Sequence, residues 1–135
     1  MKLSKHFELY EFIRSRKANE LGISNFPPEE AQQALRNLCE NLLQPLREVW
    51  GKPITINSGY RCERLNKAVG GSRTSQHMIG EAADCAVNGK AEDLLHLLLR
   101  LKLDFDQAIL YESQNFLHLS LRNNGSNRKQ VLRNK

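Results

Sequence analysis

The feature that most constrains this chain is a stripe of apolar residues between positions 28 and 50. They recur at spacings of three and four: Leu35, Leu38, Leu42, Leu46 and Val49. That period predicts a long amphipathic helix with one face turned toward a core. Pro28, followed by two glutamates, suits the first turn, where proline loses no hydrogen bond and acids meet the positive end of the helix dipole. Pro45 lies late in the stripe and should bend or end the helix locally.

The rest of the chain alternates short strand patterns with a helical one. Apolar or alternating runs predict strands at 53–56, 82–87, 105–111 and 116–121, the last two forming a hairpin, and a leucine-rich helix at 91–101. With 135 residues the chain has the size of one domain. We therefore expect an α+β fold with a small, mostly antiparallel sheet packed with helices. Residues 1–122 should form the domain, and the polar, basic residues 123–135 a flexible tail.

The charge balance bears on possible partners. The chain has 20 lysines and arginines against 15 acids, a formal net charge of +5. Such an excess favours anionic surfaces, including nucleic acid and the acidic polymers of a bacterial wall. Part of the excess is local, between Arg122 and Lys135, where few aromatic side chains interleave with the charges. Because base stacking needs such side chains, we expect no nucleic-acid partner. We also expect a monomer.

Cysteine usage and hydropathy bear on the compartment. The three cysteines, Cys39, Cys62 and Cys85, form no CxxC pair and no disulfide framework, which suits a reducing compartment. Cys39 and Cys85 are expected to be small buried hydrophobes. No apolar run approaches the roughly 20 residues that span a membrane. The first residues also lack the apolar stretch of a secretory signal. We expect a chain made in the cytoplasm that reaches a cell wall only by another route.

The segment around residue 80 carries two groups that can bind a metal. His77 falls in an aperiodic loop and Asp84 interrupts a small apolar strand, so their side chains can converge across a tight turn at Gly80. A carboxylate buried among alanines is costly unless it is paired with a cation or a metal. An ion pair of Asp84 with Arg61 or Arg73 is the alternative, and these residues alone leave it open.

The last predicted strand adds a third group. Alternation places Leu117, Leu119 and Leu121 on one face and His118 on the other, where a cleft can lie. Two imidazoles and one carboxylate, with water in a fourth position, are the ligand composition of a hydrolytic zinc site. Zinc lowers the pKa of bound water to about 7 and polarises a scissile carbonyl. The chain has no HExxH motif, which excludes the common helical metalloprotease arrangement. The remaining histidines, His6 and His96, are interpreted as bystanders.

Three motifs in this order carry a family resemblance. They are the Ser-Gly-Tyr-Arg run ending at Arg61, the SxHxxGxAxD pattern from Ser75 to Asp84, and Phe-Leu-His-Leu-Ser around His118. The chain thereby resembles the zinc D-Ala-D-Ala carboxypeptidase family (peptidase family M15), most closely its small single-domain bacterial and phage members, whose fold is compared with that of hedgehog. The resemblance covers nearly the whole chain.

The resemblance implies roles for several residues. It implies that His77, Asp84 and His118 are the zinc ligands, in agreement with the residue chemistry. It implies that Arg61 lies by the metal and binds the substrate's carbonyl or carboxylate, where a fixed cation could stabilise an oxyanion. An ion pair of Arg61 with Asp84 or Glu63 is the alternative. Ser75 and Gln76 are expected to orient ligands or to contact the substrate.

The general base is where the chain departs from the family pattern. Dipeptidase members place a glutamate three residues before the last histidine ligand, and here that position is Asn115. No histidine lies slightly upstream of His118 either. Glu112, six residues before His118, is the candidate general base, with Asp106 a poorer one. The alternative is that Glu112 is a solvated hairpin residue.

Two functions are consistent with these residues and motifs. The first is an endolysin-like zinc metallopeptidase of the D-Ala-D-Ala carboxypeptidase type, which hydrolyses peptide bonds of peptidoglycan stem peptides as a carboxypeptidase or an endopeptidase. The alternative is a catalytically weak or inactive, zinc-stabilised module that binds the cell wall. A carboxylate within reach of the metal-bound water favours the enzyme.

Overall fold

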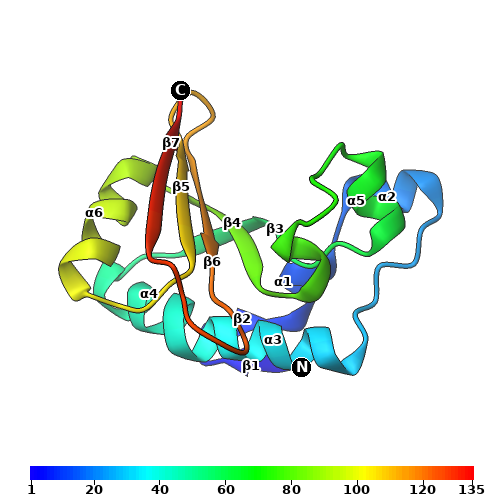
Figure 1. The fold of residues 1–135 in the computed structure, drawn as a ribbon, viewed down its shortest axis with the longest axis horizontal. Helices are drawn as coiled ribbons and strands as arrows, with labels where there is room; N and C mark the ends of the chain where they lie inside the picture. The colour runs from blue at the N-terminus through cyan, green and yellow to red at the C-terminus, as the bar shows by residue number, and fades with distance from the viewer.

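The computed structural model describes residues 1–135 (Figure 1). The helices are α1 (Leu9–Ile13), α2 (Arg16–Leu21), α3 (Glu29–Leu38), α4 (Gln44–Trp50), α5 (Glu63–Ala68) and α6 (Ala91–Leu101), with a π-helical turn at Cys39–Leu43 and a 3-10 turn at Gln76–Ile79. The strands are β1 (Lys2–Ser4), β2 (Phe7–Glu8), β3 (Ile54–Ser58), β4 (Ala82–Val87), β5 (Gln107–Tyr111), β6 (Phe116–Ser120) and β7 (Gln130–Asn134). The predicted α+β class is confirmed.

The leucine stripe forms one continuous helical rod, α3 to α4, that changes register at its centre. Pro45 has no N–H to donate to a carbonyl four residues earlier, and the π-helical turn at Cys39–Leu43 directly precedes it. Leu35, Leu38, Leu42 and Leu46 are all fully buried. Val49, predicted on the same stripe, is instead 57% exposed. The wider π turn rotates the following residues, so the stripe ends before Val49.

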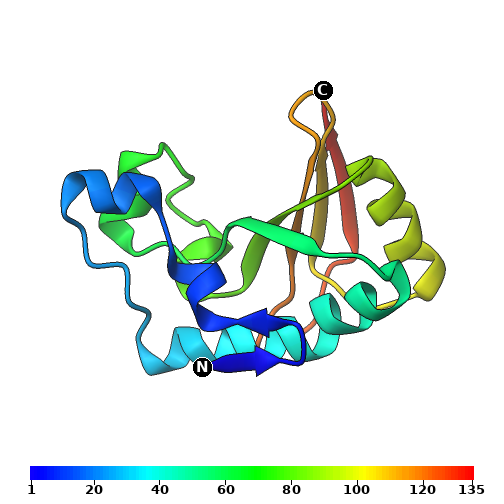
Figure 2. The ribbon, with the colours of Figure 1, turned by 180° about the vertical axis from the view of Figure 1, so that it is seen from behind.

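The main sheet has five strands in the order β3-β4-β6-β5-β7. The pairs β3–β4, β4–β6 and β6–β5 are antiparallel, and only β5–β7 is parallel. One face of this sheet packs against α6, which contacts β4, β5 and β6, and the α3–α4 rod lies at its base (Figures 1 and 2). Leu117 and Leu119 of β6 belong to the core on that face. The opposite face of the sheet is not covered by α6, so functional side chains can be exposed there.

The end of the chain differs from the predicted flexible tail. Residues 130–134 form β7, which pairs with all five residues of β5 from Gln107 to Tyr111. Without β7, the outer N–H and C=O groups of β5 would have no partner in the sheet. The sheet therefore continues beyond residue 122, where the sequence pattern had placed the end of the domain.

Two further expectations concern the cysteines and the membrane. Cys39 and Cys85 are fully buried, as predicted, and burial raises the pKa of both thiols well above the ordinary range. They are therefore protonated and unreactive at neutral pH. None of the helices combines the length and the apolar character that a membrane crossing requires.

Candidate metal centre

The structure brings the three predicted ligands together. Asp84 on β4 and His118 on β6 are directly opposite each other in the antiparallel ladder, so their side chains leave the same face of the sheet. His77 reaches them from the 3-10 turn, which ends at Gly80 in a left-handed conformation. Asp84 Oδ1 lies 2.9 Å from His118 Nδ1 and 3.3 Å from His77 Nε2. One ligand atom from each residue falls within 4.8 Å of the other two.

The position of His77 is fixed by its surroundings. Its Nδ1 lies 2.7 Å from the carbonyl oxygen of Gly59, which leaves Nε2 directed at Asp84. A ligating imidazole commonly has such a carbonyl behind it, because the hydrogen bond sets the tautomer and the ring orientation. Ser75 Oγ accepts a hydrogen bond from the His77 backbone N–H at 3.1 Å. The predicted orienting role of Ser75 therefore has a structural basis in the cap of the ligand's own turn.

Gly59 in turn is pressed against the N-terminal segment. A Cβ atom at this position would lie 2.6 Å from the Cα and the carbonyl oxygen of Phe12. The next residue, Tyr60, donates its backbone N–H to that same Phe12 carbonyl at 2.7 Å. The end of α1 therefore positions the Gly59 carbonyl, and this carbonyl in turn orients the His77 ring.

The donor set fits a divalent metal of the zinc type. Four ligands at about 2.0–2.1 Å in tetrahedral geometry lie about 3.3 Å from one another. The separations of 2.9 and 3.3 Å around Asp84 Oδ1 are close to that value. Burial by itself raises the pKa of Asp84, but the close contacts of its carboxylate with the His118 and His77 rings outweigh this and hold that pKa well below its ordinary range. Asp84 is therefore a carboxylate at neutral pH, the form that binds a cation.

The triad lies at the bottom of a cleft of about 490 Å³. One wall comes from residues 70–77, including the predicted Ser75 and Gln76, and the other from Gln107, Ile109 and Tyr111 of β5 together with Arg128. A second hollow of about 580 Å³ adjoins it and shares Arg61 and Asp84. Asp84 is the only acidic residue that lines either hollow. The surroundings of the triad are therefore polar and positively charged.

Arg61 lies at the junction of the two hollows. Its side chain is half-buried, and its Nε has no hydrogen-bond partner in the structure. Burial lowers the pKa of Arg61, and the nearby Asp84 and Tyr111 partly offset this effect. Asp84 makes its close contacts with the two histidines, and no ion pair joins it to Arg61 or Arg73. Arg61 therefore places a half-buried guanidinium against both hollows, with no ion pair to Asp84.

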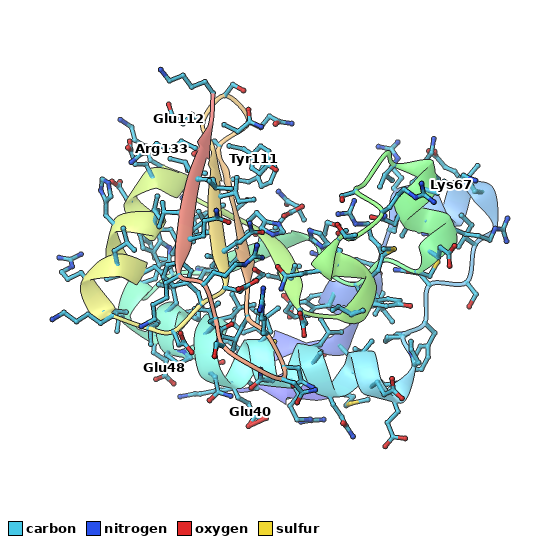
Figure 3. The ribbon with its side chains drawn as sticks, in the orientation of Figure 1. Glu40, Glu48, Lys67, Tyr111, Glu112 and Arg133 are labelled. Atoms are coloured by element: carbon cyan, nitrogen blue, oxygen red, sulfur yellow. The ribbon has the colours of Figure 1, made fainter.

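The structure does not bring Glu112 to the cleft. Its carboxylate lies 3.2 Å from Nη1 of Arg133, which also pairs with Glu92 of α6 at 2.9 Å. Figure 3 shows Glu112 and Arg133 on the α6 side of the sheet, whereas Tyr111 points the other way. This placement does not support the predicted general-base role of Glu112, which stays a prediction for mutagenesis.

The two other positions considered for the base have structural partners. Asn115, where dipeptidase members have glutamate, accepts the Ala91 backbone N–H at 2.8 Å and adopts a left-handed conformation in the hairpin link. Asp106 is fully buried and is bound by Arg122 and Arg128. Neither side chain offers a free carboxylate to the cleft.

Comparison with known proteins decides the family. A family model described as Peptidase M15 matches residues 5–120. The chain belongs to the peptidase M15 family. Over 43 residues it is 51% identical to the zinc D-Ala-D-Ala carboxypeptidase of Streptomyces albus G, a stretch that covers 31% of this chain and 17% of that relative. The predicted family is confirmed, and the M15 match includes all three residues of the triad.

Some residues of the M15 cleft were not among those predicted from the sequence. Gln107, Ile109 and Tyr111 could have been found, because alternation along the hairpin puts them on the same face as His118. Arg128 gave no signal, since it lies in a segment whose composition predicts a flexible tail.

Proposed function

We propose that this protein is a zinc-dependent peptidase that cuts peptide bonds in the stem peptides of bacterial peptidoglycan. The observation that carries the proposal is the convergence of His77, Asp84 and His118 at the bottom of a cleft. Two imidazoles and one carboxylate leave a fourth position open for water or substrate, as catalytic zinc sites require and structural ones do not. The zinc named for the Streptomyces albus G relative agrees with this donor set.

Each residue then has a defined task. His77, Asp84 and His118 would hold the ion, which when bound supplies a water of lowered pKa and polarises a carbonyl. Arg61 lines the cleft beside Asp84, and its guanidinium would donate to the oxygen on which negative charge develops during attack. Ser75 keeps His77 in position through the turn cap. Gln76 is tied to Glu81 at 3.0 Å and lines the cleft, where it can contact a substrate amide.

The substrate class follows from the relative and from the charge of the cleft. The relative is named for action on D-Ala-D-Ala. Both hollows around Arg61 are lined by basic and polar side chains, with Asp84 as their single acid. Peptides with free carboxylates, which peptidoglycan stems supply, suit such a lining.

One observation favours a second function, a zinc-stabilised module that binds the cell wall with little or no turnover. The cleft contains no carboxylate that is free to act as a general base, because Asp84 is taken up by the two histidines. General-base assistance commonly contributes about 10²–10⁴-fold to a hydrolytic rate. Without it the metal site would still bind peptides.

A direct experiment separates these functions. Zinc-loaded protein is incubated with purified muropeptides, and released amino acids or peptides are identified by mass spectrometry. The peptidase predicts product from wild type and from Asp93→Ala, a control that removes an exposed acid on α6. It predicts loss of both product and zinc binding in Asp84→Ala. Product from neither wild type nor control, with zinc and muropeptides still bound, would establish the binding module instead.

A further inference from the structure

We propose that Arg128 binds the free carboxylate of the substrate one residue beyond the scissile bond, and so makes the enzyme a carboxypeptidase. This inference rests on the proposed peptidase function and names its specificity. Arg61 follows β3 at one side of the triad, and Arg128 precedes β7 at the other side of the sheet order β3-β4-β6-β5-β7. The two arginines therefore flank the metal ligands from opposite sides of one cleft.

Arg128 is held rigidly by a buried acid. Asp106 has no exposed surface and accepts three hydrogen bonds from Arg128: from the backbone N–H at 2.9 Å, from Nε at 3.0 Å and from Nη2 at 2.7 Å. A forked pair of this kind fixes the plane of the guanidinium. Nη1 makes no hydrogen bond within the protein, and the side chain is 45% exposed. One edge of a fixed guanidinium is thus left facing the cleft.

The charge around Arg128 is not neutralised. Arg122 also lies close to Asp106, 3.1 Å from its Oδ1, so two guanidinium groups share one carboxylate. Asp104, 2.8 Å from the amide of Asn127, is exposed and is not among the residues that line the cleft. The β5 wall therefore carries a net positive charge, which a substrate carboxylate would compensate.

The spacing along the sheet suits a terminal carboxylate. Ile109 is opposite His118, and Gln107 stands two residues further along β5, about 7 Å away. Arg128 is bound to Asp106, the next residue along. A residue beyond the scissile bond adds about 3.5 Å of chain, and the metal–oxygen contact and one N–H···O bond add roughly 2 and 3 Å. Because Arg128 lines the same cleft beyond Gln107, a carboxylate at the end of that residue would meet the Arg128 side of the cleft, whereas a longer leaving chain would run against this wall.

The assay compares two otherwise identical stem peptides, one with a free C-terminal carboxylate and one with a C-terminal amide. We expect wild type to cleave the acid about 10- to 100-fold more efficiently in kcat/KM, as for loss of a hydrogen bond between charged groups. In Arg128→Ala the preference should shrink to within about twofold, mainly through KM of the acid. Arg122→Ala is the matched control, because Arg122 pairs with the same Asp106 but does not line the cleft.

Each outcome decides the inference. Equal cleavage of acid and amide by wild type refutes the role of Arg128 and leaves the proposed peptidase intact, whereas cleavage of neither refutes both. An equal loss for both peptides in Arg128→Ala would indicate a purely structural role and overturn the proposal. If that variant does not fold, Arg128→Lys replaces it, since an ammonium keeps a cation for Asp106 but cannot bind two carboxylates in a fork. An unchanged preference in Arg128→Lys would also refute the assignment.

Discussion

Replacing Gly59 by alanine should weaken metal binding without touching a ligand. The added Cβ would lie 2.6 Å from the Cα and the carbonyl oxygen of Phe12, and both of these are backbone atoms that cannot rotate away. The segment after β3 must therefore move out by several tenths of an ångström. Its Gly59 carbonyl, 2.7 Å from His77 Nδ1, moves with it.

The expected size of the effect follows from these two contacts. Overpacking of this kind costs about 1–3 kcal/mol of unfolding free energy. For a chain of this length, 2 kcal/mol corresponds to a melting temperature lower by roughly 8 °C. Loss of a hydrogen bond that orients a metal ligand commonly reduces metal affinity by about 10- to 100-fold. Both effects should therefore appear together in Gly59→Ala.

Competition with a chromophoric zinc chelator gives the affinity, and thermal unfolding followed by circular dichroism gives the stability. Gly22→Ala is the control, because Gly22 has φ +66° but nothing within 4 Å of an added Cβ. It should lose about 1–2 kcal/mol through backbone strain and keep wild-type zinc affinity. Wild-type affinity in a folded Gly59→Ala would refute the idea that the Phe12 contact positions His77.

Three further outcomes are expected. Glu112→Gln should change kcat/KM by less than about twofold and the free energy of unfolding by less than about 1 kcal/mol, because Glu112 pairs with exposed Arg133 on the α6 side. A loss of kcat/KM above roughly 100-fold would instead support the general-base role of Glu112. Hydrogen bonds from Arg128 depress the pKa of Asp106, so its stabilisation is complete above the unfolded pKa of about 3.9 and is lost as pH falls toward the lower folded value. Asp106→Asn should therefore be less stable by about 2 kcal/mol at pH 7 and lose less than wild type below about pH 4 in urea titrations. Zinc at about 100 times its Kd should stabilise wild type by about 2.7 kcal/mol, reversed by chelation and absent in Asp84→Ala; equal stabilisation of that variant would place the metal elsewhere.

The ligand set was predictable because each ligand sits in a pattern that the sequence displays directly. Alternation in β6 separates His118 from the leucines of the core, and Asp84 interrupts a strand of small residues. The direct pairing of Asp84 with His118 depends on strand order, which a local pattern does not contain. The family resemblance, which covers all three motifs, indicated that these residues lie together.

The position of Glu112 could have been predicted by applying strand alternation along β5 up to residue 112. With Ile109 opposite His118, alternation along β5 puts residues 107, 109 and 111 in the cleft and turns residue 112 to the opposite side. The register of the hairpin decides this, and one residue more or less in the link would reverse it. The prediction that Val49 faces the core was wrong because the π turn shifts the register of the helix. The prediction of a flexible tail missed β7 because an exposed strand has little hydrophobic signature.

The route from Phe12 through Gly59 to His77 also has a consequence for how the protein matures. The parts of the metal site come from residues 12, 59, 77, 84 and 118, so no short piece of chain contains a site. Contacts between such distant positions form late, because the loops between them must close first. The ion therefore cannot seed folding as it does in a zinc finger. It should bind a sheet already assembled, and refolding should proceed at the same rate with or without zinc.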